Sequence, residues 1–565
     1  MHRFVLAVLV LLPAPCSPLP AQALRDTVER YTLDREALSR RYAVEYDAGR
    51  RQRYQRFCAE WQKRLEAIAY DRLDVEGRID WQLLANAVRR ELALLELEAR
   101  RAGEMRRLVP FGDAIMGLME TRRRLETVKP RETSATLAHL ARQIDTLRTG
   151  MEAGEDRDTA RAARIIALRG VGLIDALRGT LTDWYRYYEG YDPVFTWWNA
   201  DPWKRADSAL VKYARTLRRQ VIGQKDGEDE PIIGDPIGAD ALRAELAFEL
   251  IPYGPEDLLR IAEREFAWCE AEMQKATREL GQGADWKAAL EQVKNTYVEP
   301  GRQTDLVRDL AREATEYVES RGLVTVPPLA KEIWRMEMLS PERQKVSPFF
   351  LGGEVIQVSY PTDEMSAEDK LMSLRGNNPH FSRATVHHEL IPGHHLQRFM
   401  TRRYMSHRQE FSTPFWTEGW ALYWEMRLWD LGFPRGPEDR VGMLFWRMHR
   451  AARIIFSLRF HMGTMTPQQA IDFLVDRVGH ERANATAEVR RSFNGSYPPL
   501  YQLAYMIGGL QFRALHRELV TNGRMSERAF HDAVLQGGNM PVEMVRARLL
   551  QTSLARDYRA RWLFE

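Results

Sequence analysis

Residues 383–399, RATVHHELIPGHHLQRF, place four histidines around a single glutamate. They come close to the H-E-x-x-H motif, a helix in which two histidines one turn apart face one metal ion and the glutamate polarises water. The match is incomplete, because Pro392 stands four residues after His388, where the second histidine should be. The stretch therefore indicates either a modified metal motif or a chance cluster.

The spacing around Pro392 favours a modified motif. In a regular helix His394 would point roughly 120° away from His388, since each residue turns the helix by about 100°. Pro392 removes a backbone donor and Gly393 tolerates unusual dihedral angles, so a two-residue bulge would return His394 to the metal-facing side. His395 reaches that side without a bulge, but about 10 Å further along the axis. We therefore expect His394 as the second ligand, with His395 as the alternative.

A second segment, residues 416–426, supplies candidate carboxylates. A hydrolytic zinc site uses three protein ligands and leaves one position open for water. Glu418 and Glu425 share one face of a stretch that is otherwise rich in tryptophan. A carboxylate on so apolar a helix is costly to bury unless it is paired or bound to metal. We predict Glu418 as the third metal ligand and Glu425 as the hydrogen-bond partner of a ligand imidazole.

The chain as a whole has a helical texture, with apolar residues at helical spacing among good helix formers. Its 565 residues exceed the usual size of one hydrophobic core. The polar stretch 223–231 predicts a loop between an N-terminal helical half, residues 24–222, and a C-terminal metal-binding half, residues 239–565. The clearest strand, 354–360, predicts a small β-sheet or hairpin shortly before the histidines. The clearest predicted helices are 29–70, 80–97, 133–150, 159–186, 239–280, 304–320 and 438–461.

The first residues are typical of a cleaved signal peptide, predicted at 1–23. A basic start precedes an apolar run over 4–12, and Ala-Gln-Ala at 21–23 offers a cleavage site before Leu24. The run is far shorter than the roughly 20 residues of a membrane-spanning helix. Lipidation at Cys16 is a further alternative, which its flanking prolines disfavour. We expect a periplasmic or secreted protein without a membrane span.

The charge and cysteine content exclude other classes of site. The formal net charge is only +3, so there is no electrostatic case for a nucleic-acid partner. Beyond the signal peptide, Cys58 and Cys269 could form one disulfide in an oxidising compartment. Two cysteines are too few for a cysteine-ligated zinc site, so histidine and carboxylate are the expected ligands.

Two motifs resemble the paired signatures of the bacterial "domain of unknown function 885" family. That family is grouped with the zinc metallopeptidases that use glutamate as the third ligand, and its relatives by fold include carboxypeptidase Taq, thimet oligopeptidase and angiotensin-converting enzyme. The likeness covers most of the mature chain, including segments 235–238, 251–258 and 500–508. The two motifs are His388-Glu389-x-x-Pro392-Gly393-His394-x-x-Gln397 and Glu418-Gly419-Trp420-Ala421-x-Tyr423-x-Glu425.

The resemblance implies a mainly α, two-lobed helical body with a long central groove. It also implies one Zn²⁺ ion held by His388, His394 and Glu418, with Glu389 as the general base. On this basis we expect an exported zinc-dependent metallopeptidase that hydrolyses short peptides.

Peptide hydrolysis also needs a hydrogen-bond donor for the developing oxyanion, which a tyrosine or histidine of another helix would supply. Tyr505, in the late segment of the resemblance, is the first candidate, followed by Tyr501 and His461. Each of the two tyrosines has an alternative role as a core residue. An extended peptide could pair with the strand at 354–360 through main-chain hydrogen bonds, unless that strand merely caps the fold.

Which end of a peptide would be trimmed depends on which terminal charge the protein binds. An exopeptidase must bind that charge, and Arg375, Arg453 and Arg459 are among the arginines that could do so.

Two other functions compete with the peptidase. The same ligands would serve a zinc amidase or esterase acting on a non-peptide substrate such as a cell-wall fragment. A non-catalytic zinc- or peptide-binding protein is the second alternative, although a binding site has no need of a base at Glu389. The ligand set would also hold another first-row divalent ion.

Overall fold

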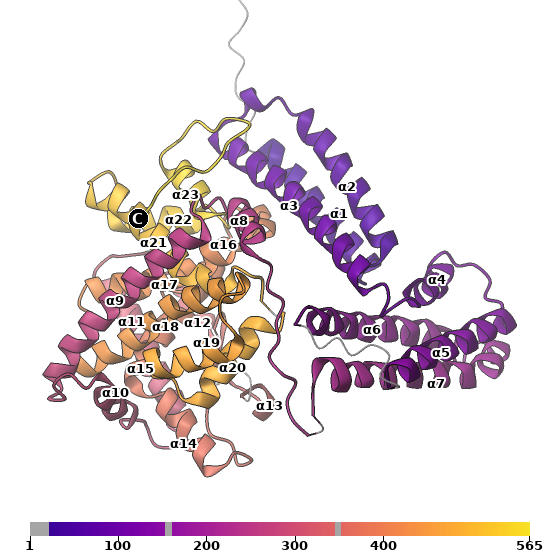
Figure 1. The fold of residues 1–565 in the computed structure, drawn as a ribbon. Coiled ribbons are helices and arrows are strands. Elements are labelled where there is room, and N and C mark those ends of the chain that lie inside the picture. The colour runs from indigo at the N-terminus through magenta and orange to yellow at the C-terminus, as the bar shows by residue number, and fades with distance from the viewer. Residues whose placement is uncertain (1–21, 153–160, 226, 345–351, 496) are drawn as a thin grey trace, which may run out of the picture.

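The computed structural model describes residues 22–152, 161–225, 227–344, 352–495 and 497–565. The structure is mainly helical, with 71% helix and 2% strand, which confirms the predicted fold class. Figure 1 shows three groups of helices: α1–α3, an arm formed by α4–α7, and a large C-terminal body.

The first group consists of three long helices. The pattern predicted as one helix over 29–70 is two helices, because Asp47 begins the second by accepting a hydrogen bond from the Arg50 amide (2.7 Å). Asp74 caps the third helix in the same way through the Gly77 amide (2.7 Å). The elements are α1 (Gln22–Arg41), α2 (Ala48–Glu66), η1 (Tyr70–Arg72) and α3 (Val75–Met105).

The arm encloses a core of its own, in which the ring centres of Trp184 and Phe195 lie 5.3 Å apart. Gly223 ends the arm in the left-handed conformation (φ 84°), and the described residues from 223 to 238 form no helix or strand, as the predicted loop requires. The elements are α4 (Gly112–Arg123), α5 (Pro130–Glu152), α6 (Arg161–Tyr188), α7 (Pro193–Thr216) and η2 (Leu217–Ile222).

The C-terminal body contains the two motifs. The pattern predicted as one helix over 239–280 is divided at residues 249–254, where the chain turns before Pro255. The helices are α8 (Ala239–Phe248), α9 (Pro255–Glu279), α10 (Trp286–Lys294), α11 (Gln303–Ser320), α12 (Pro328–Ile333), α13 (Pro341–Gln344), α14 (Ala367–Gly376), α15 (Pro379–Glu389), α16 (His394–Thr401), η3 (Ser406–Phe411), α17 (Pro414–Asp430), α18 (Pro437–His461), α19 (Pro467–Phe473), η4 (Leu474–Val478), α20 (Arg482–Phe493), α21 (Tyr501–His516), η5 (Arg517–Thr521), α22 (Glu527–Gln536) and α23 (Val542–Leu549).

A two-stranded sheet lies against the first motif helix. Strand β1 (Arg335–Met338) pairs in parallel with β2 (Val355–Val358), so the expected small sheet is present but is not a hairpin. The register aligns Arg335 with Val355 and Met338 with Val358. Ile356 and Val358 are fully buried in one apolar cluster with Val386 and Leu390. The sheet is therefore fixed to α15.

The hydrophobic cores divide the chain differently from the two expected halves. One core contains Trp61 and Leu84 of the first group together with Trp420 and Phe512 of the C-terminal body. Helices α1–α3 therefore belong with the C-terminal body, whereas α4–α7 have a separate core. Figure 1 shows this arm set apart from the body. The two lobes are thus the arm and everything else; the central groove stays a prediction.

The predicted signal peptide, 1–23, lies almost wholly outside the described residues, because the described chain starts with α1 at Gln22. Cys58 and Cys269 are buried in different cores and are both free, so the possible disulfide between them is absent. None of the helices in the described ranges is long and apolar enough to cross a membrane.

Candidate metal centre

The first motif is two helices rather than one bulged helix. Helix α15 ends at Glu389, a cis peptide bond joins Ile391 to Pro392, and α16 begins at His394. Gly393 is required for close approach, because a Cβ atom there would lie 1.9 Å from the His388 carbonyl oxygen. The chain thus folds back on its own helix end. This break places the ring centres of His388 and His394 4.8 Å apart.

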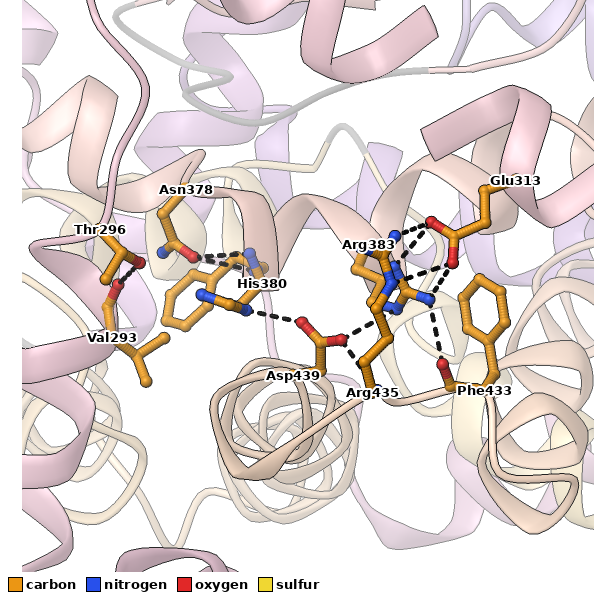
Figure 2. Close-up of polar contacts among 10 residues, drawn as sticks. Val293, Thr296, Glu313, Asn378, His380, Arg383, Phe433, Arg435 and Asp439 are labelled. Atoms are coloured by element: carbon orange, nitrogen blue, oxygen red, sulfur yellow. Dashed lines mark hydrogen bonds and ion pairs between the residues drawn. The ribbon is translucent and has the colours of Figure 1, made fainter. Parts of the chain in front are cut away.

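Helix α15 is held in place by a polar network on its N-terminal half, drawn in Figure 2. Asn378 caps the helix by accepting hydrogen bonds from the next amides. His380 Nδ1 lies 2.6 Å from Asp439 Oδ1 of α18, and Arg383 Nη1 donates to Glu313 Oε2 of α11 at 2.9 Å. Arg383 Nε lies 3.3 Å from Asp439 Oδ2. These contacts fix the direction in which His388 emerges, one and a half turns further along.

The second motif lies on α17, which Thr413 caps through the Phe415 amide. Helices α17 and α21 cross with their backbones in contact. A Cβ atom at Gly508 would lie 2.1 Å from the Phe415 carbonyl oxygen, and one at Gly419 would lie 2.6 Å from Gly508 Cα. Both glycines are therefore needed for this crossing. It brings α21 beside Glu418.

His388, His394 and Glu418 form one buried cluster whose three candidate ligand atoms lie within 4.8 Å of one another. Glu418 Oε2 is 3.1 Å from His394 Nε2 and 3.6 Å from His388 Nε2. Ligand atoms about 2.1 Å from a tetrahedral zinc ion are roughly 3.4 Å apart, so these distances suit one zinc ion. The structure thus assembles the three predicted ligands, and their side chains fit the predicted metal.

The outer nitrogens of the two imidazoles have partners of their own. His388 Nδ1 donates to Glu425 Oε1 at 2.6 Å, as predicted for Glu425. His394 Nδ1 lies 3.5 Å from Gln397 Oε1, and Gln397 Nε2 donates to the Trp416 carbonyl oxygen at 3.2 Å. These partners leave both Nε2 atoms directed at Glu418, which is the arrangement that metal-binding histidines require.

Charge inside the cluster follows from burial and from the carboxylates. Burial lowers the pKa of His388, but the hydrogen bonds with Glu418 and Glu425 outweigh it and raise this pKa to about 9. Burial raises the pKa of Glu418, yet the two imidazoles hold it well below the usual range of a glutamate. A zinc ion would therefore have to displace a proton from His388.

Two tyrosines of α21 complete the wall of the site. The Tyr501 hydroxyl donates to Glu418 Oε1 at 2.6 Å. The Tyr505 ring is stacked on His388, with ring centres 6.1 Å apart. Burial raises the pKa of both hydroxyls, so each is a hydrogen-bond donor at neutral pH. Both oxyanion-donor candidates from α21 thus lie at the cluster.

The other candidate histidines lie elsewhere. His395 Nε2 donates to the Ala330 carbonyl oxygen at 2.7 Å, so the structure does not bring the alternative ligand to the cluster. His461 ends α18 with its ring against Phe460, and it lies about 12 Å along the helix beyond Arg453, which does reach the site. His461 as an oxyanion donor is therefore not supported by this geometry.

Glu389 lies at the end of α15 and is partly exposed. The backbone of Gly352 rests against it, since a Cβ atom at that glycine would lie 2.3 Å from Glu389 Oε2. Arg398 Nη1 donates to the Gly352 carbonyl oxygen at 3.0 Å, which holds the approach to β2 over the candidate base. The segment that leads into β2 therefore lies against Glu389 at Gly352.

Arginines were the least predictable part of the site. Arg453 lies beside Tyr505, with its guanidinium carbon 4.6 Å from the ring centre, and so does Arg450 at 4.7 Å. Arg453 was among the predicted candidates and Arg450 was not, although their spacing of three residues puts both on one helical face. Arg375 and Arg459 pair with other acids, Arg375 with Glu291 and Arg459 with Glu263.

Fold and site together define a mainly helical protein with a buried His-His-Glu cluster that can hold one metal ion. The chain belongs to the DUF885 family of bacterial proteins of unknown function, whose sequence pattern matches residues 34–549. No match was found among the curated proteins.

Two solved structures resemble the whole chain. A "putative lipoprotein of unknown function" from Shewanella oneidensis has a TM-score of 0.69 at 18% identity, with 94% of this chain and 100% of that chain covered. A "putative lipoprotein" from Colwellia psychrerythraea has a TM-score of 0.59 at 15% identity, with 94% and 98% covered. At these identities the likeness concerns the fold alone.

Proposed function

We propose that this protein is an exported zinc-dependent metallopeptidase that hydrolyses short peptides. The observation that carries the proposal is the buried cluster of His388, His394 and Glu418, with Glu389 directly after the first histidine. Three ligands suit a hydrolytic zinc site, which keeps its fourth position for water and substrate. A site that only binds metal has no need of an acidic side chain in that place.

Each residue near the cluster has a distinct part in this reaction. When bound, zinc supplies a Lewis acid that polarises the scissile carbonyl and lowers the pKa of water to about 7. The Glu389 carboxylate accepts the proton of the attacking water and delivers it to the leaving amine. The Tyr505 hydroxyl donates a hydrogen bond to the substrate carbonyl oxygen as negative charge develops there. Glu425 keeps the His388 imidazole oriented.

Strand β2 would align the substrate. The segment before it contacts Glu389 at Gly352, and the strand packs on α15 through Ile356 and Val358. An extended peptide that pairs with such a strand is held by its main chain, which allows many side-chain sequences. This fits an enzyme that acts on mixed short peptides.

Export is the second element of the proposal. It is supported by the signal-peptide pattern at 1–23 and by the names of the two similar structures, since lipoproteins are exported proteins. Mass spectrometry of the mature N-terminus should find Leu24 first. A lipid-modified Cys16 would preserve export but correct the cleavage site, and a retained Met1 would contradict both.

The deciding experiment exposes a mixed peptide library to the zinc-loaded mature protein and identifies products by mass spectrometry. Glu389→Gln is the matched control, because it preserves size and leaves the ligands in place. We expect products from the wild type, formed about 10²–10⁴-fold more slowly by the variant. If bound zinc yields no Glu389-dependent products, the peptidase is rejected. The amidase or esterase and the binding protein then take its place.

A further inference from the structure

Helix α18 presents two buried arginines to the wall of the candidate site. Arg450 and Arg453 are only 5% and 2% exposed. Their guanidinium carbons lie 4.7 and 4.6 Å from the centre of the Tyr505 ring. Another neighbour of that ring is the candidate ligand His388, with ring centres 6.1 Å apart. Both guanidinium groups therefore lie no farther from the metal cluster than the length of about three extended residues.

The hydrogen-bonding capacity of these arginines is not used up. Arg453 Nε donates to Glu488 Oε1 at 2.7 Å, but its Nη1 is buried without a hydrogen-bond partner among the described residues. Arg450 Nε is likewise buried without a hydrogen-bond partner in that part of the chain, and Arg450 Nη2 lies 3.5 Å from Glu425 Oε1. A buried guanidinium N–H without a partner is costly, and these N–H groups have donor capacity left for a ligand.

The arginines near Tyr505 also share their carboxylate partners. Arg491 Nε donates to the second oxygen of Glu488 at 2.6 Å, so Arg453 and Arg491 share one carboxylate. Glu425 is shared between Arg450 and the His388 imidazole. None of these three described arginines thus has a carboxylate to itself. Buried charge is tolerated when it is paired, so a further anion would improve the pairing of this group.

We propose that Arg450 and Arg453 bind the C-terminal carboxylate of a peptide, which makes the protein a carboxy-terminal exopeptidase. The inference rests on the proposed peptidase function and specifies its substrate class. A guanidinium matches a carboxylate geometrically, because its planar N–H groups donate two parallel hydrogen bonds. A carboxylate held here lies one to about three residues from the metal cluster, so cleavage releases a single amino acid or a very short peptide.

The other arginines considered for this task do not compete. Arg375 is paired with Glu291 and Asn295, and Arg459 is paired with Glu263 at 39% exposure. The remaining explanation for Arg450 and Arg453 is that they only support the Tyr505 ring through cation–π contacts. A purely supporting pair would not distinguish a peptide that ends in a carboxylate from one that ends in an amide.

The test measures binding rather than turnover. A library of acetylated tetrapeptides, prepared once with free C-terminal carboxylates and once as amides, is passed over immobilised mature Glu389→Gln protein, with and without zinc. We expect the free acids to be retained about 10- to 100-fold more strongly, the range for a hydrogen-bonded charge pair. Arg450→Lys and Arg453→Lys keep the charge but lose the planar fork, and each should remove most of that preference.

The matched control is Arg459→Ala on the same helix, which should keep the full preference. Equal retention of acids and amides, retention of neither, or a preference that survives both lysine variants would overturn the inference. If a variant fails to fold, the comparison of acids with amides on the Glu389→Gln protein alone still decides. Glu389-dependent cleavage within peptides or from their N-terminus would support the peptidase and contradict the carboxylate clamp.

Discussion

The crossing of α17 and α21 gives the sharpest prediction, because two glycines in one helix face different surroundings. A Cβ atom at Gly508 would lie 2.1 Å from the Phe415 carbonyl oxygen and 2.8 Å from Gly419 Cα. Side-chain carbons do not come that close to backbone atoms, so the helices would have to separate by about 1 Å. A Cβ atom at Gly509 would only touch Leu422, at 3.4 Å, an ordinary contact distance.

The two alanine variants should therefore change the free energy of unfolding in opposite directions. Replacing a mid-helix glycine by alanine contributes about 1 kcal/mol to helix stability, which Gly509→Ala should retain. Gly508→Ala gains the same helix stability, but overpacking costs about 1–3 kcal/mol. Because the contact here is with rigid backbone, we expect the upper end of that cost and a net loss of about 2 kcal/mol in the free energy of unfolding. The shift would also move Tyr501 and Tyr505 relative to Glu418, and a misplacement of about 1 Å can cost about 100-fold in rate.

Urea denaturation of the two variants and the wild type measures the first effect. Competition for zinc against a chelator, together with the peptide assay, measures the second. The reasoning is refuted if Gly508→Ala is as stable as Gly509→Ala and binds zinc like the wild type. It would then follow that α17 and α21 do not touch through their backbones at this point.

Three further predictions concern single side chains. Glu425→Gln should weaken zinc binding about 10- to 100-fold, because it removes the carboxylate that orients His388, and a chelator competition titration measures the loss. Tyr501→Phe removes the hydroxyl that donates to Glu418 Oε1, so zinc affinity should fall by about 10-fold while the circular dichroism spectrum stays unchanged. Burial lowers the pKa of His531 to about 3, so the unfolded chain takes up its proton first as the pH falls below about 6.5. His531 should therefore lower the free energy of unfolding by about 2 kcal/mol between pH 7 and pH 5. In urea denaturation, His531→Gln should lack this contribution to the pH dependence of the midpoint. Parallel midpoint curves for variant and wild type would contradict it.

The helical elements were predictable because their signals are local. Apolar periodicity predicted the helices, and the break between α1 and α2 also has a sequence signal, the N-cap residue Asp47. The packing of α1–α3 on the C-terminal body was not predictable. It depends on contacts such as those joining Trp61 to the core of Trp420, more than 300 residues later, and periodicity says which face is apolar but not which partner covers it.

The site shows the same division. His388, Glu418 and Glu425 could be found because metal chemistry restricts both residue type and spacing. The structure brings His394 to His388 and Glu418, but not through the expected bulge: the helix ends and starts again. Arg450 was not predicted, because Arg447 follows the same three-residue spacing and the spacing alone does not separate the two. His461 was favoured by residue type alone, and helix length places it too far along.

Residues of the second motif stabilise the break between α15 and α16 in the first motif. Glu418 meets both histidines, while the next two residues act on other elements. Gly419 admits α21 to backbone contact, and Trp420 Nε1 donates to the Pro392 carbonyl oxygen at 3.0 Å, which holds the break itself. Three consecutive residues of α17 thus supply a ligand, position the helix that carries the tyrosines, and fix the turn that brings His394 into place. The H-E-x-x-P-G-H segment is therefore held in this shape by Glu-Gly-Trp, and changing Trp420 to phenylalanine should loosen His394 by removing the hydrogen bond to Pro392.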